Sequence, residues 1–460
     1  MNPEPERTER EEELLKQLDS FDDEERREAL QELKELEARG EVSTKDATPG
    51  WVNMHAHTFY SYNARGYSPS RYAWEAYRRG LEVAGIVDFD CLDGTEEFLR
   101  AGQTLGLKAA AGFETRCFIP EYSDVEINSP NEPGVYYLAG TGFDASPREG
   151  TDAAETFADM RRMARGRNEA MMDKINAHVP EIAIDYDEDV LPLTPSGNAT
   201  ERHMLAAYED KARRKYPDPD SLAAYWSDKL EVDRSTVESV MDDLPALKGL
   251  IRKKLMKKGG VGFVEPDEGS FPDIDRVVEA TLEVEALPTA CWLDGTSEAE
   301  SNPMAHFRFL KNKGIPTMTI IPDRNWDVDD PQEKQMKLEK LEEVVEVARE
   351  LNMPILVGTE MNKTSQRFVD AFDTPELKPY VEDFRTGALV AWGHTLLKMT
   401  ANLSYTGDWS REQFGDDEEA RNEFYRRAGE APMPSNNTLK SLCRMGADDS
   451  PNDILNLLEG

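Results

Sequence analysis

The sequence has 460 residues, which is room for roughly two to four domains or for one large domain with additions. It carries 54 Lys and Arg residues against 91 Asp and Glu residues, so its formal net charge at pH 7 is −37. This charge argues against a binder of duplex nucleic acid, because the phosphate backbone requires a basic surface. No apolar run is long enough to cross a membrane, and the charged N-terminus lacks the apolar stretch of a signal peptide. The four cysteines form no CxxC pair, which is typical of reduced thiols and predicts a cytoplasmic location.

Residues 1–46 are predicted to form an acidic helical arm. Leu15 and Leu18 make one short apolar stripe, and Leu30, Leu33 and Leu36 make another. Such narrow stripes do not stabilise isolated helices, so we expect the arm to lie on the body of the protein or on a partner, with disorder as the alternative. Residues 1–40 are therefore a candidate contact segment for a protein partner.

From Trp51 onward, short apolar runs alternate with helical patterns. This order predicts parallel strands joined by helical connections, as in a barrel or a doubly wound sheet. Residues 151–260 interrupt it with four helical patterns and are predicted to be an insertion, while residues 401–460 are predicted to be a polar C-terminal extension. The body would then span residues 47–400. The predicted strands cover residues 51–57, 83–88, 109–114, 135–139, 287–292, 315–321, 354–359 and 388–392.

Polar residues fall where these predicted strands end. His55 and His57 alternate at the end of the first strand, so both face the same side. Later strands end in Asp88, Glu114 and Glu360. Two imidazoles and two carboxylates that converge on one point suit Zn²⁺, Mn²⁺ or Fe²⁺, which lower the pKa of bound water and polarise an ester oxygen. The pattern therefore predicts a divalent metal site at one mouth of the barrel.

These motifs, in their order along the chain, resemble those of the PHP superfamily, which is named for polymerase and histidinol phosphatase members. The resemblance covers residues 51–365 and implies a distorted (β/α)7 barrel that hydrolyses phosphoesters, usually with a trinuclear metal cluster. The matching segments are His55-Ala56-His57, residues 85–98 with Asp88-Phe89-Asp90, Gly112-Phe113-Glu114, Arg202-His203 and Glu360-Met361-Asn362.

The sequence also departs from the pattern of this family. Phe89 and Tyr136 stand where the family has histidines, and Asn362 replaces the histidine of the last motif. The ligands of one metal position remain, with Glu360 in place of an aspartate. We therefore expect one ion of Mn²⁺, Zn²⁺ or Fe²⁺ per chain, held by His55, His57, Glu114 and Glu360.

Three further residues are weaker candidates for metal ligands, namely Cys291, Asn362 and His394. Cys291 would favour Zn²⁺ through its thiolate, but it also fits a small buried apolar position. His394 follows a predicted strand, and a hydrogen-bonded structural role is the alternative for it. Arg324, which follows another predicted strand, is expected to reach the same rim.

Asp88, Arg202 and His203 are the candidates for catalytic roles. Asp88 would position the nucleophile or a metal ligand. Arg202 and His203 open a predicted helix, where a basic pair and the helix N-terminus can hold a phosphate; an exposed pair on an amphipathic helix is the alternative. The sequence contains no P-loop, no GxGxxG segment and no GxSxG elbow, which leaves metal-assisted hydrolysis as the best-supported chemistry.

The resemblance and the motifs together predict a metal-dependent phosphoesterase that acts on a small phosphorylated molecule through a metal-bound hydroxide. The rival prediction is a degenerate barrel that binds a ligand or partner without catalysis, because two of the family's metal positions have lost most of their ligands. Hydrolysis of an amide or a lactone at a single metal is a third possibility, and the fold by itself does not separate these three.

Overall fold

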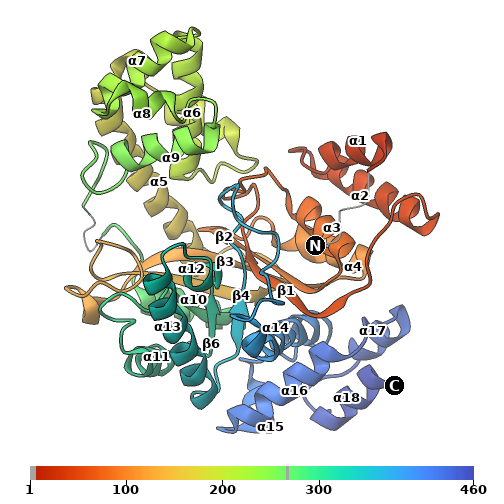
Figure 1. Cartoon of the computed structure of the whole chain (residues 1–460). Helices are drawn as coiled ribbons and strands as arrows, with labels where there is room; N and C mark the ends of the chain where they lie inside the picture. Colours follow the sequence, from red (N-terminus) through yellow and green to blue (C-terminus); the bar gives the residue numbers. More distant parts are fainter. Residues whose placement is uncertain (1–6, 266–268) are drawn as a thin grey trace.

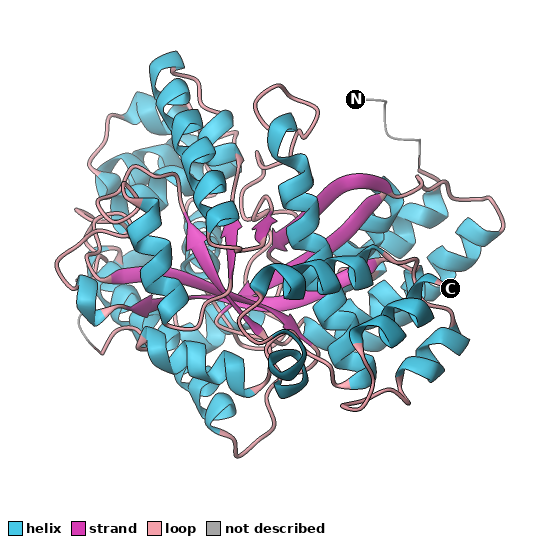
Figure 2. Ribbon diagram, turned by 90° about the horizontal axis from the view of Figure 1, so that it is seen from below, coloured by secondary structure: helices cyan, strands magenta, loops and turns pink. Residues whose placement is uncertain are grey.

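The computed structural model describes residues 7–265 and 269–460 of the chain. A seven-stranded sheet with the order β1-β2-β3-β4-β5-β6-β7 lies at its centre. A parallel bridge between Ala56 and Glu360 connects the two edges, so the sheet curves into a nearly closed barrel enclosed by helices (Figures 1 and 2). The predicted fold, a distorted α/β barrel, is thereby confirmed. The strands are β1 (Thr48–Ala56), β2 (Leu81–Phe89), β3 (Lys108–Phe118), β4 (Val135–Phe143), β5 (Leu287–Trp292), β6 (Thr317–Ile320) and β7 (Ile355–Val357).

One strand runs against its predicted direction. The strands β1 to β3 pair in parallel, as do β5 to β7, whereas β4 is antiparallel to both β3 and β5. The reason is the connection from β3 to β4, residues 119–134, whose helical content is the short 3₁₀ turn η1 (Pro120–Tyr122). A parallel pair needs a longer crossover connection. The C-terminal end of β4 therefore lies at the opposite mouth of the barrel from the C-terminal ends of β1 and β3.

The predicted strand at residues 388–392 is wrong, because this segment lies inside helix α14 (Val381–Ala401). Every residue from Gly387 to Lys398 is buried, and a helix without a polar face has the same apolar run as a buried strand. Gly387 lets the helix approach β7, since a Cβ there would come within 1.9 Å of the Ile355 carbonyl oxygen. The helix α14 also contacts β1 to β4 and closes the mouth where the parallel strands begin.

The outside of the barrel is covered by helices that follow the strands, and the C-terminal segment joins this layer. Residues 401–460 were predicted to be a polar extension, but their aromatic residues, among them Trp409, Phe424 and Tyr425, belong to the main core. Figure 1 shows these helices in blue beneath the barrel. The helices of this layer are α3 (Pro69–Arg79), α4 (Thr95–Leu105), α10 (Ile274–Glu283), α11 (Pro303–Asn312), α12 (Asp323–Trp326), α13 (Pro331–Glu350), α15 (Asp408–Phe414), α16 (Glu418–Glu430), α17 (Asn436–Leu442) and α18 (Pro451–Glu459).

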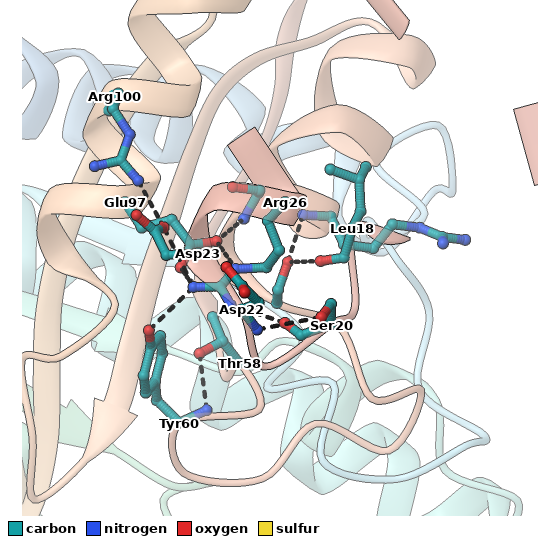
Figure 3. Close-up of polar contacts among 12 residues, drawn as sticks. Leu18, Ser20, Asp22, Asp23, Arg26, Thr58, Tyr60, Glu97 and Arg100 are labelled. Carbon is teal, nitrogen blue, oxygen red and sulfur yellow. Dashed lines mark hydrogen bonds and ion pairs between the residues drawn. The ribbon is translucent and has the colours of Figure 1, made fainter. Parts of the chain in front are cut away.

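The N-terminal arm consists of α1 (Glu9–Gln17) and α2 (Asp23–Ala38), and α2 packs on α3 and α4. Arg26, which is 1% exposed, donates from Nη2 and Nε to the two carboxylate oxygens of Glu97, at 2.6 and 2.9 Å, and from Nη2 to the Tyr60 hydroxyl at 3.3 Å (Figure 3). The arm is thus fixed to α4 and to the loop that follows β1. Its two apolar stripes are buried, namely Leu14, Leu15, Leu18, Leu30, Leu33 and Leu36.

The helical insertion between β4 and β5 projects beyond one mouth of the barrel as a separate lobe (Figure 1). It has a core of its own, which includes Ile175, Tyr208 and Trp226. Its helices are α5 (Asp152–His178), α6 (Glu201–Lys215), α7 (Pro219–Leu230), α8 (Arg234–Glu238) and α9 (Leu244–Leu255), with the short turns η2 (Pro180–Ile182), η3 (Tyr186–Val190) and η4 (Leu191–Leu193).

No helix within residues 7–265 and 269–460 combines the length and the apolar character needed to cross a membrane.

Candidate metal centre and pocket

Three buried side chains converge at the mouth where β1 and β3 approach the insertion. His55 lies at the end of β1, His57 follows directly after it, and Glu114 lies in β3. The Oε2 atom of Glu114 is 3.2 Å from His57 Nε2 and 3.5 Å from His55 Nε2. One potential ligand atom from each residue lies within 4.8 Å of the others, and this is the one such group in the described part of the chain.

The orientation of the two imidazole rings fits a divalent cation. The Nδ1 atom of His55 is 3.2 Å from the Thr319 hydroxyl, and that of His57 is 3.5 Å from the Ser61 hydroxyl. Neither buried Nε2 atom has a hydrogen-bond partner. Each ring thus uses its Nδ1 side for contact with a hydroxyl and directs a free Nε2 atom toward Glu114, which is the arrangement of metal-binding histidines. A cation between these atoms would satisfy all three of them.

The charge states around the triad are consistent with this arrangement. Burial raises the pKa of Glu114, but His55 and His57 more than offset this effect and lower its pKa to about 2. Burial lowers the pKa of His57, yet Glu114 outweighs it and raises that pKa overall. Glu114 is therefore an anion that attracts positive charge to this point.

Glu360, the predicted fourth ligand, lies beside the triad but outside the group of converging atoms. Its backbone closes the barrel, because His57 N donates to the Glu360 carbonyl oxygen and Glu360 N donates to that of His55. Its carboxylate accepts from Arg324 Nη2 at 2.6 Å and from Gln366 Nε2 at 2.9 Å. The predicted position of Arg324 at this rim agrees with the structure. Its ion pair with Glu360 had no signal in the sequence, because only the fold brings α12 next to the segment that follows β7.

The weaker ligand candidates fall at three different places. Cys291 lines the pocket near the triad, with the pKa of its thiol raised well above the usual value by burial. Asn362 lines it too, and its Nδ2 lies 3.3 Å from Glu360 Oε2. The structure does not bring His394 to the site. This histidine lies in α14, where its ring nitrogens contact the Gly142 carbonyl oxygen at 3.1 Å and the Tyr405 amide at 3.0 Å.

Aromatic side chains occupy the positions where the PHP pattern has further histidines. Phe89 stacks on His57 with ring centroids 4.5 Å apart and an angle of 12° between the planes. The hydroxyl of Tyr136 donates to the Cys291 carbonyl oxygen at 2.9 Å. Phe89 therefore orients a histidine of the triad by packing and offers no ligand atom.

Asp88 is hydrogen-bonded through its carboxylate to the loop that follows β1. Its carboxylate accepts from the Thr58 amide at 2.7 Å, from the Thr58 hydroxyl at 2.6 Å and from the Ser61 hydroxyl at 2.6 Å. It is 1% exposed and does not line the pocket, so it has no direct path to a substrate. Ser61 also lies against His57, so Asp88 is connected to the triad through this loop, and its predicted positioning role stays a prediction.

The predicted catalytic pair divides into one pocket residue and one helix cap. Arg202 lines the pocket, lies over the Tyr62 ring at 5.4 Å and donates from Nη2 to Asn362 Oδ1 at 3.3 Å. His203 does not line the pocket. Its Nδ1 accepts from the Thr200 amide at 3.0 Å and completes the capping box of α6, and burial lowers its pKa to about 4.

A cavity of about 360 Å³ opens above the triad, between the mouth of the barrel and the insertion. Basic side chains outnumber acidic ones in its wall by seven to four, although the whole chain carries a charge of −37. This pocket could not be predicted from the sequence, because its residues come from segments far apart in the chain. The basic residues are Arg116, Arg167, Arg202, Arg252, Lys257, Arg324 and Lys363, and the acidic ones are Asp90, Glu114, Glu201 and Glu360.

Comparison with known proteins yields similarity in structure only. No family model matches the sequence, and no curated protein matches it. A solved structure similar to it is an amidohydrolase from Chromobacterium violaceum with bound sulfate and no metal, at 14% identity over 73% of this chain and 96% of that chain, with a TM-score of 0.45. Another comes from Bifidobacterium adolescentis and is named for an inferred metal-dependent phosphoesterase activity, at 15% identity over 72% of this chain and 96% of that chain, with a TM-score of 0.42. At these values the likeness identifies no activity.

Proposed function

We propose that the protein is a metal-dependent hydrolase that cleaves a phosphoester of a small molecule. The observation that carries this proposal is the pair of buried Nε2 atoms of His55 and His57 that converge on the Glu114 carboxylate beneath a basic pocket. Imidazole and carboxylate ligands suit a divalent cation, and a basic wall suits a phosphate group.

The residues of the site have different roles in binding and in orientation. A divalent cation held by His55, His57 and Glu114 would supply Lewis-acid polarisation and lower the pKa of water there. Arg202 reaches the pocket from the insertion, where its guanidinium can donate two hydrogen bonds to a phosphate. Arg324 faces the same space and holds the carboxylate of Glu360 in a fixed position.

We also propose that the protein is a member of the PHP superfamily with one metal ion per chain. Two observations support this assignment. The HxH motif and Gly112-Phe113-Glu114 come together at one mouth of a barrel, as the resemblance implies. Phe89 fills the place of a further ligand by stacking on the triad. Manganese, zinc and iron are the proposed metals, and the separated, unpaired cysteines support a cytoplasmic location.

The test combines metal content with activity. Purified protein is equilibrated with Mn²⁺, Zn²⁺ or Fe²⁺, desalted and analysed for metal, and hydrolysis of p-nitrophenyl phosphate is measured before and after EDTA. We expect about one ion per chain, activity that EDTA abolishes, and loss of both in the double variant His55→Ala/His57→Ala. His178→Ala, which removes a histidine of the insertion far from the triad, is the matched control. Stoichiometric metal in the double variant would contradict the ligand assignment.

One observation favours the alternative of a binding protein without catalytic activity. The carboxylate expected to complete the metal ligands, Glu360, is already engaged by Arg324 and Gln366. A protein of this kind would bind phosphorylated molecules in the basic pocket and hydrolyse none of them. Binding of inorganic phosphate without turnover of any phosphoester, in protein shown to hold metal, would decide for this alternative.

A further inference from the structure

The seven basic residues of the pocket fall into two sets by the residues that they contact. One set lies around Glu360. Arg324 is ion-paired with it, Arg202 contacts the neighbouring Asn362, and Lys363 follows in the same loop. The other set, the distal cation cluster, comes from β3, α5, α9 and the turn after α9. It consists of Arg116, Arg167, Arg252 and Lys257.

The distal cation cluster holds like charges close together. The guanidiniums of Arg116 and Arg167 both lie over the ring of Phe271, at 4.7 and 4.3 Å from its centroid. Arg252 and Lys257 both pair with the single carboxylate of Glu201, the latter at 2.9 Å. The chain therefore brings four cations to the wall of the cavity from three separate segments, namely β3, α5, and α9 with the turn after it.

The carboxylates around this cluster do not balance its charge. Arg116 pairs with Glu132 at 2.9 Å, but Arg167 comes no closer than 3.9 Å to Asp90. Glu201 is shared by two cations. Four positive groups thus face three negative ones in a partly exposed place.

Two members of the cluster, Arg167 and Lys257, have lowered pKa values. Burial, reinforced by Arg116, lowers the pKa of Arg167 to about 10 even though Asp90 acts in the opposite direction. Burial also lowers the pKa of Lys257, with Arg252 adding to the effect. Burial lowers the pKa of Arg116 too, but Tyr137 and Glu132 outweigh it and raise that pKa overall. For Arg167 and Lys257, burial outweighs the nearby carboxylates of Asp90 and Glu201.

We propose that the distal cation cluster binds a second anionic group of the substrate, so that the substrate is a small molecule with a phosphoester at one end and a second phosphate or a carboxylate at the other. This inference rests on the proposed function for the position of the first phosphate. Guanidinium groups bind phosphate and carboxylate through paired hydrogen bonds. A cavity of about 360 Å³ admits a small metabolite.

The inference is tested by binding of phosphonates, which are not hydrolysed. Calorimetric titration of the metal-loaded protein compares propylphosphonate, which has one anionic group, with 3-phosphonopropionate and propane-1,3-diyl bisphosphonate, which have two. We expect at least one of the latter to bind tenfold or more tightly than propylphosphonate. A preference for the bisphosphonate alone identifies the second group as a phosphate, and equal preference for both identifies a site for either anion.

Variants test which residues cause the preference for ligands with two anionic groups. In the double variant Arg167→Gln/Lys257→Gln, the phosphonates with two anionic groups should bind within about twofold of propylphosphonate. The affinity for propylphosphonate itself should not change. The single variant Lys257→Gln should lose part of the preference for two anionic groups. Because this position is half-exposed, the single variant still tests the inference if the double variant does not fold. Lys258→Gln is the matched control, because this neighbouring lysine lies outside the pocket wall. Equal affinity of the unmodified protein for all three phosphonates would overturn the inference even in an active phosphoesterase. A retained preference in a protein without hydrolytic activity would instead defeat the proposed function and support the second anion site.

Discussion

The buried ion pair between Arg26 and Glu97 should determine whether the N-terminal arm stays on the barrel. Arg26 is 1% exposed and Glu97 is 4% exposed, and two hydrogen bonds of 2.6 and 2.9 Å connect them (Figure 3). Glu97→Gln leaves a buried guanidinium beside one exposed carboxylate, that of Asp23 at 3.3 Å. Breaking a buried pair in this way costs about 3–5 kcal/mol. Because Arg26 holds α2 to α4, we expect this cost to appear as local opening of the arm.

Hydrogen exchange of the amides in α2 measures this opening directly. At about 1.4 kcal/mol per factor of ten, the exchange of Leu30 and Leu33 should accelerate by about 10²-fold or more in Glu97→Gln, up to the rate of an unprotected chain. The double variant Arg26→Met/Glu97→Gln should open less than the sum of the two single variants, because it no longer buries an unpaired charge. Strictly additive effects, or exchange in α2 that Glu97→Gln does not change, would refute the reasoning.

Three further predictions concern the site and its surroundings. Arg324→Gln should tighten Mn²⁺ binding by roughly tenfold in calorimetry, because the Glu360 carboxylate loses a charge-assisted competitor worth about 1.5–3 kcal/mol; unchanged affinity would show that Glu360 is no ligand. EDTA should lower the melting temperature of metal-loaded protein, since a metal at 100 times its Kd stabilises the fold by about 2.7 kcal/mol, and His55→Ala should remove this difference. Burial lowers the pKa of His306 to about 4, and neither ring nitrogen has a hydrogen-bond partner. Its folded pKa lies below the unfolded value of about 6.5, so stability is lost as the pH falls below 6.5, by about 2 kcal/mol at pH 5. Urea unfolding at pH 7.5 and pH 5 should show a smaller pH effect in His306→Phe.

The sequence was sufficient to predict the barrel strands and the triad, because both depend on local pattern. Period-two alternation predicts that His55 and His57 lie on one side of a strand. Glu114 is predicted to lie near them because it ends the third predicted strand, residues 109–114. The direction of β4 was not predictable in the same way. It depends on a connection of residues 119–134 that has the composition of a loop, and nothing in the runs themselves reveals which way a strand points.

The prediction failed where residues act through a fold that brings distant segments together. The ion pair of Arg324 with Glu360, a predicted metal ligand, was not foreseen, because no spacing rule connects these two positions. The sequence pattern predicts a strand inside helix α14, because complete burial removes the polar face that distinguishes a surface helix. His394 then appeared to follow a strand, whereas it contacts Gly142 at the closed mouth of the barrel.

The distribution of charge is compatible with the proposed anionic ligand, although the protein as a whole is acidic. A net charge of −37 repels phosphate at long range, but at physiological salt this repulsion is largely screened beyond about 8 Å. Inside the cavity the nearest fixed charges dominate, and there basic side chains outnumber acidic ones by seven to four. A positive potential for the proposed anion would therefore come from residues that line the cavity, among them Arg116, Arg167 and Lys257. The overall acidity of the chain is thus the basis for expecting no duplex nucleic acid, whose phosphates extend along a surface, and it does not conflict with the proposed small anion in the pocket.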